Sequence, residues 1–136
     1  MRKVYQNKFS SDPDNLVEVE KFISHIADEL KINEEIKSNL SLSVSEASSN
    51  AMVHGNKLDP NKFIQISVTV NDNKIEVIIK DEGNGFDPDS IPDPTSPENL
   101  LKDSGRGIHI MRSFLHEVKY NFTPEGTEVI LIASLK

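Results

Sequence analysis

The hydrophobic residues change their spacing part-way along the chain, and this change restricts the fold more than any other feature. From Leu16 to Ala51 apolar side chains recur every three or four residues, the pattern of helices with one buried face. From Ile64 to Ile79 they alternate with polar residues, the pattern of half-buried strands. A chain with helices first and strands afterwards predicts helices packed on one face of a sheet.

Turn and capping residues divide these patterns into elements. Pro13 follows a potential capping residue, and Gly55 with Asn56 is a good helix terminator. The predicted order is a short strand at 3–9, helices at 14–30 and 34–54, a β-hairpin at 64–79, an irregular segment at 87–104, a short helix that opens at 105, and strands at 118–122 and 129–135. The predicted fold class is α+β, a two-layer α/β sandwich whose mixed, mainly antiparallel sheet is covered on one face by helices.

Composition restricts the class of protein further. The 136 residues carry a formal net charge of −7, which argues against a general binder of nucleic acid or anionic membranes. Cysteine is absent, so disulfides and thiolate metal sites are excluded. The first residues lack the apolar core of a signal peptide, and no run is long enough to span a bilayer. We expect one soluble, cytoplasmic domain covering 1–136.

Two polar residues lie beside the apolar stripe of the second predicted helix. Glu46 and Asn50 are four residues apart, so their side chains point the same way from adjacent turns. Considered alone, such a pair is more often a solvated helix face than a functional site. The other polar clusters of the chain decide between a solvated face and a functional site.

Two glycine-rich clusters follow. Asp81 comes at the end of a predicted strand with Gly83 and Gly85 after it; a carboxylate there can accept a hydrogen bond from an exocyclic amine, and glycines allow close approach to a planar ring. Gly105, Arg106 and Gly107 open a predicted helix, where exposed N–H groups favour an anion. Each cluster alone is compatible with a plain turn.

Taken together, the three clusters match the needs of one ATP–Mg²⁺. The chain resembles the GHKL ATPase superfamily, which includes gyrase, histidine kinases and the mismatch-repair ATPases. SEASSNAMVHGN (45–56) resembles its N-box, and DEGNGFDP (81–88) and SGRGIHIM (104–111) resemble its two glycine boxes. Gly126 and Thr127 match the short element that completes the adenine pocket. The resemblance covers almost the whole chain and implies the Bergerat type of ATP-binding fold, with 87–104 as the ATP lid.

The resemblance also implies roles for individual residues. Asn50 ligates Mg²⁺, and Glu46 accepts the proton of an attacking serine or threonine hydroxyl. Asp81 binds the adenine amine, and His54 makes a contact at the helix end or with the lid. The remaining residues implied at the nucleotide are Gly83, Gly85, Gly105, Arg106, Gly107, Ile108 and Thr127, with Lys102 and Arg112 as weaker candidates for phosphate contacts.

Within the superfamily the chain is most similar to the anti-sigma-factor serine/threonine kinases, through the form N-A-x-x-H-G-N after the Glu (50–56). This likeness implies a sigma factor and an anti-sigma-factor antagonist as partners, and a homodimer. Arg106 departs from it, because several such kinases carry an apolar residue there, and the acidic, Pro-rich lid allows no prediction of its contacts. Two other interpretations stay open: an ATP-gated binding switch with little kinase activity, and a detached histidine-kinase ATP domain.

Overall fold

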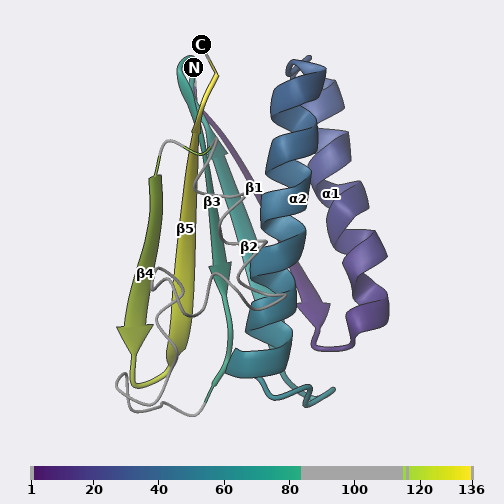
Figure 1. Ribbon diagram of the computed structural model, residues 1–136, viewed down its shortest axis with the longest axis vertical. Helices are drawn as coiled ribbons and strands as arrows, with labels where there is room; N and C mark the ends of the chain where they lie inside the picture. Colours follow the sequence, from purple (N-terminus) through teal and green to yellow (C-terminus); the bar gives the residue numbers. More distant parts are fainter. Residues whose placement is uncertain (1, 84–114, 116, 136) are drawn as a thin grey trace, which may run out of the picture.

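A computed structural model of the chain describes residues 2–83, 115 and 117–135. Within them, five strands form one sheet, and helices cover one of its faces (Figure 1). The elements are β1 (Lys3–Ser10), a 3-10 turn (Pro13–Asn15), α1 (Leu16–Glu29), α2 (Glu34–Asn50), a π-helical turn (Ala51–Gly55), β2 (Phe63–Val70), β3 (Lys74–Lys80), β4 (Glu117–Thr123) and β5 (Gly126–Ser134). The predicted two-layer α+β architecture is confirmed.

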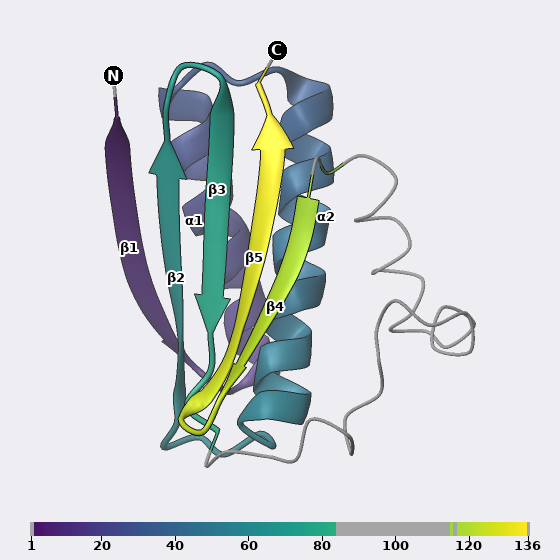
Figure 2. The same ribbon diagram turned by 90° about the vertical axis from the view of Figure 1, so that its left-hand side faces the viewer.

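The sheet has the strand order β1-β2-β3-β5-β4, and Figure 2 shows its open face with the helices behind it. Every pairing between described strands is antiparallel, where the sequence predicted a mixed, mainly antiparallel sheet. The register aligns Ile66 with Ile79 and Val77 with Leu131, and all four side chains are buried. Alternate residues of the inner strands therefore supply the sheet side of the core.

Both predicted helix starts are confirmed by their capping bonds. The Asp12 carboxylate accepts a hydrogen bond from the N–H of Asp14 at 2.9 Å, and Pro13 occupies the first turn. The Asn33 side chain caps α2 by accepting from the N–H of Glu35 at 2.7 Å. Such caps satisfy N–H groups that have no partner within the helix, and each is worth about 1 kcal/mol.

The core lies between the helix layer and the sheet. Val19, Ile23 and Ile26 of α1 meet Leu40 and Val44 of α2, and all five side chains are almost fully buried. Burying one such aliphatic side chain stabilises the fold by about 1.5–3 kcal/mol. Neither helix of the described residues is long and apolar enough to cross a membrane.

Candidate functional site

The candidate site lies where α2 and β3 both end, at the same end of the molecule (Figures 1 and 2). Asp81 directly follows β3 and is only 2% exposed. Buried carboxylates are rare unless they have partners, so the contacts of this residue define what the site can bind.

Backbone groups hold one oxygen of the Asp81 carboxylate. Its Oδ1 accepts hydrogen bonds from the N–H of Thr127 at 2.9 Å and the N–H of Gly83 at 3.1 Å. The N–H of Asp81 in turn donates to the carbonyl of Thr127 at 3.1 Å, which extends the β3–β5 pairing by one residue. The carboxylate is therefore oriented, and among the described residues none donates to its second oxygen, Oδ2.

Two glycines allow the chain to pass close to this carboxylate. A Cβ atom on Gly55 would lie 2.0 Å from Asp81 Oδ2, well inside any permitted contact. Gly126 has φ of +148°, and a Cβ there would lie 2.4 Å from the Asp81 carbonyl oxygen. Only glycine avoids both the overlap and the strain of that backbone conformation.

The burial of Asp81 also has an electrostatic consequence. Burial raises the pKa of its carboxyl group, and the hydrogen bonds from Thr127 and Gly83 oppose this shift. The charged form is therefore poorly solvated in the free protein. A ligand that donates a hydrogen bond to Oδ2 would stabilise the charged form.

A change of helix type brings Gly55 to this carboxylate. The sequence predicted one helix as far as Val53 or His54, whereas the α-helix ends at Asn50 and continues as the π-helical turn. The N–H of Asn56 closes this turn on the carbonyl of Ala51 at 2.9 Å. Short π segments inside helices are rare and are frequent at functional sites.

Glu46 and Asn50 occupy adjacent turns of α2, and both side chains are half-buried. Burial raises the pKa of the Glu46 carboxyl group, which is the direction expected for a general base that must hold a proton briefly. His54 is exposed on the π-helical turn. Their roles in phosphoryl transfer, metal binding and lid contact stay predictions.

The structure joins Asp81, Gly83 and Thr127 by hydrogen bonds, and their predicted role at the nucleotide stays a prediction. It adds Gly55 and Asn56, which the sequence indicated only as a helix terminator within the H-G-N segment. The predicted lid at 87–104 and several predicted site residues lie outside the described residues: Gly85, Lys102, Gly105, Arg106, Gly107, Ile108 and Arg112.

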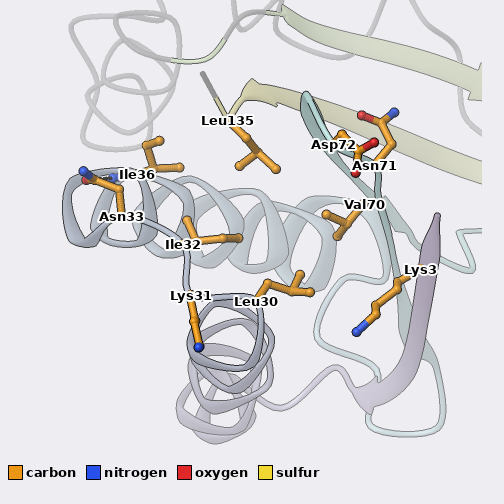
Figure 3. A pocket seen from close by; sticks show the side chains of 10 residues that line it. All are labelled: Lys3, Leu30, Lys31, Ile32, Asn33, Ile36, Val70, Asn71, Asp72 and Leu135. Carbon is orange, nitrogen blue, oxygen red and sulfur yellow. Dashed lines mark hydrogen bonds between the residues drawn. The ribbon is translucent and has the colours of Figure 1, made fainter. Parts of the chain in front are cut away.

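Two cavities of the described residues lie away from the face of α2 that carries Glu46 and Asn50. One, of about 320 Å³, touches Asp81 but is lined by Lys8, Gln65 and Lys80, which align across the open face of the sheet. The other, of about 410 Å³, lies between the α1–α2 connection and the β2–β3 turn, at the opposite end of β3 from Asp81 (Figure 3). Neither cavity brings Asp81 and α2 together.

Comparison with known proteins assigns the family. Residues 9–133 match the family described as histidine kinase-like ATPase domain. The chain belongs to this family. An ATPase domain implies ATP as its ligand, in agreement with the resemblance seen in the sequence.

Curated relatives share a more specific name. The chain is 39% identical over 97 residues to an anti-sigma F factor of Anoxybacillus flavithermus, a match that covers 68% of this chain and 65% of that protein. It is 42% identical over 91 residues to an anti-sigma F factor of Shouchella clausii, covering 63% of this chain and 61% of that protein. The chain thus spans less than two thirds of the length of these relatives.

Solved structures support the fold. The histidine kinase domain of a blue-light activated kinase from Erythrobacter litoralis superimposes with a TM-score of 0.62 at 18% identity, covering 93% of this chain and 62% of that one. The mycobacterial sensor histidine kinase MprB gives a TM-score of 0.51 at 15% identity, covering 96% of this chain and 97% of that one. At such identities the likeness concerns the fold alone.

The raised pKa of Glu46 predicts how stability depends on pH. Ionising Glu46 costs more in the folded chain than in the unfolded chain, so its charge destabilises the nucleotide-free protein at neutral pH. Glu46→Gln should therefore raise the free energy of unfolding at pH 7. The gain should fall as the pH decreases and vanish below the ordinary Glu pKa of about 4.3, where both states are protonated.

Urea denaturation of the nucleotide-free protein between pH 3 and pH 8 measures this difference. The exposed turn residue Glu125 supplies the control, because Glu125→Gln changes the net charge equally without removing a buried group. Equal pH dependence in the two variants would show that burial of Glu46 has no effect on stability.

Proposed function

We propose that this chain is an anti-sigma factor with ATP-dependent protein serine/threonine kinase activity, which sequesters a sigma factor and phosphorylates an anti-sigma-factor antagonist. The observation that carries the nucleotide part is the Asp81 carboxylate, whose Oδ1 is held by two backbone N–H groups while Oδ2 faces the bare Gly55. The anti-sigma part is supported by relatives named anti-sigma F factor at 39–42% identity.

The Asp81 site fits the base of ATP. The 6-amino group of adenine is a hydrogen-bond donor, and Oδ2 is an oriented acceptor that no described residue uses. Gly55 lies directly against this oxygen, and the Cβ of any other residue there would overlap the carboxylate. Thr127 and Gly83 keep the carboxylate from rotating, so little ordering is needed when the base binds.

Asn50 is the proposed protein ligand for Mg²⁺, through its side-chain oxygen. The described residues contain no group of three His, Cys, Asp or Glu that could hold a metal ion by themselves. Mg²⁺ in phosphoryl-transfer sites is held by one or two protein oxygens together with substrate phosphates, so a single amide oxygen fits this mode. We propose this role for Asn50 because it lies one turn from Glu46 on α2.

Glu46 is the proposed general base. ATP supplies the phosphoryl group. Glu46 would accept the proton of the serine or threonine hydroxyl as its oxygen bonds to the γ-phosphorus, while the bond from that phosphorus to the bridging oxygen breaks and ADP leaves. The raised pKa of Glu46 brings it closer to the pH at which a base works best. The lid and the phosphate-binding roles of Arg106 and its neighbours belong to this proposal as predictions.

A homodimer remains part of the proposal, as does a cytoplasmic location. β1 forms an edge of the described sheet, and its residue Val4 is 53% exposed. Val17 of α1 is 54% exposed, whereas Phe22 packs edge to face against Phe9 with ring centroids 6.0 Å apart. Val17 thus stays available for a contact between copies, and Phe22 serves the core instead.

Specific binding of ATP should depend on Asp81. Asp81→Asn keeps the shape but replaces one acceptor oxygen by a donor, which opposes the adenine amine. The loss should be about 2–4 kcal/mol, or roughly thirtyfold to a thousandfold in affinity. Isothermal titration calorimetry with ATP and Mg²⁺ measures it, and wild-type affinity in the variant would contradict the adenine assignment.

Kinase activity should depend on Glu46 separately from binding. With a candidate antagonist protein and ATP–Mg²⁺, Glu46→Gln should keep nucleotide affinity and lose most phosphoryl transfer, whereas Asn50→Ala should lose Mg²⁺-dependent affinity as well. The phosphorylated product should survive acid, as phosphoserine does. An acid-labile product would favour the histidine-kinase interpretation, and nucleotide binding without any transfer would favour the ATP-gated switch.

A further inference from the structure

The side chain of Asn56 joins four chain segments at the candidate site. Asn56 is 1% exposed. Its Nδ2 donates to Ser11 Oγ at 2.7 Å and to the Phe63 carbonyl at 3.0 Å, and its Oδ1 accepts from the N–H of Glu82 at 2.7 Å. Both donor hydrogens and the acceptor are used, so the side chain has one defined orientation.

The hydrogen bond between Asn56 and Glu82 lies beside the close contact of Gly55 with Asp81. Gly55 immediately precedes Asn56, and Asp81 immediately precedes Glu82. Gly55 approaches the Asp81 carboxylate so closely that a Cβ would lie 2.0 Å from Oδ2. The Asn56–Glu82 bond therefore connects the two segments one residue beyond their closest approach.

The hydrogen bonds of the Asp81 carboxylate do not themselves fix the distance between Asp81 and Gly55. Thr127 and Gly83 both bind Oδ1, and they fix the carboxylate relative to β5 and to its own segment. Within the described residues, the Asn56 side chain makes the only hydrogen bond between the end of the π-helical turn and the segment after β3. It thus fixes Oδ2 relative to the helix layer.

We propose that Asn56 is a positioning residue for recognition of the nucleotide base: it sets the separation between Gly55 and Asp81 and so places Oδ2 against the exocyclic amine. The inference rests on the proposed function, in which Asp81 binds adenine. Guanine presents a carbonyl oxygen where adenine presents its amine, so the position of Oδ2 determines the preference for ATP over GTP. Asn56 acts through Asp81 and does not itself contact the base.

The test compares the dissociation constants of ATP–Mg²⁺ and GTP–Mg²⁺ by calorimetry on the full chain. Partial unfolding scales both affinities equally, so their ratio does not respond to a mere loss of stability. Asn56→Ala should reduce the preference for ATP by about tenfold or more. If that variant does not fold, Asn56→Ser serves instead, since its shorter hydroxyl side chain cannot reach the Glu82 N–H.

Ser11→Ala is the matched control. Ser11 Oγ accepts from Asn56 and donates to the carbonyl of Lys62 at 2.9 Å, so this variant weakens the same buried network but keeps the bond to Glu82. It should leave the ratio within about twofold of the wild type. An equal loss of preference in Ser11→Ala would overturn the specific role of the Asn56–Glu82 bond.

Two further outcomes separate the inference from the proposed function. An unchanged ratio in Asn56→Ala, together with a lost preference in Asp81→Asn, overturns the positioning role and leaves adenine binding intact. An unchanged ratio in Asp81→Asn, or no preference in the wild type, overturns adenine recognition by Asp81 and the inference with it.

Discussion

The buried carboxylate of Asp81 is the constraint on which the rest of the site depends. Its Oδ1 accepts two backbone hydrogen bonds, one of them from Thr127 at the start of β5, and so couples the end of β3 to the β4–β5 hairpin. The same group creates the need for Gly55 and Gly126, because side chains at either position would overlap Asp81. Burying a charge costs stability, so a buried carboxylate with one oxygen that no described residue binds marks a candidate functional site.

The helix layer reaches this carboxylate through a local irregularity rather than through regular packing. α2 presents Glu46 and Asn50 while it is α-helical, and the π-helical turn after Asn50 then carries Gly55 to Asp81. Directly after that turn, the Asn56 side chain accepts a hydrogen bond from the N–H of Glu82. The proposed metal ligand and base lie on α2 and the proposed adenine acceptor follows β3, and the π-helical turn and the Asn56–Glu82 hydrogen bond link these segments at one end of the molecule.

The sequence predicts the regular parts of this arrangement and misses the irregular one. Strict alternation at Ile64–Ile79 predicts the β2–β3 hairpin, and the capping residue ahead of Pro13 predicts where the first helix starts, because these signals are local. The family resemblance implies that Asp81, Gly83 and Thr127 bind one nucleotide; the structure joins the three by hydrogen bonds, and their binding role stays a prediction. The π-helical turn and the role of Asn56 were not predictable, because both depend on tertiary contacts with Glu82 and Asp81.

The pKa of Asp81, followed by carboxyl ¹³C NMR with and without saturating ATP–Mg²⁺, tests the central claim most directly. In the free protein burial should hold this pKa above the ordinary value of about 3.9. Bound adenine donates a hydrogen bond to the charged form, so the pKa of Asp81 should fall when the nucleotide binds. A pKa that is the same in the free and the ATP-saturated protein would contradict base recognition by Asp81.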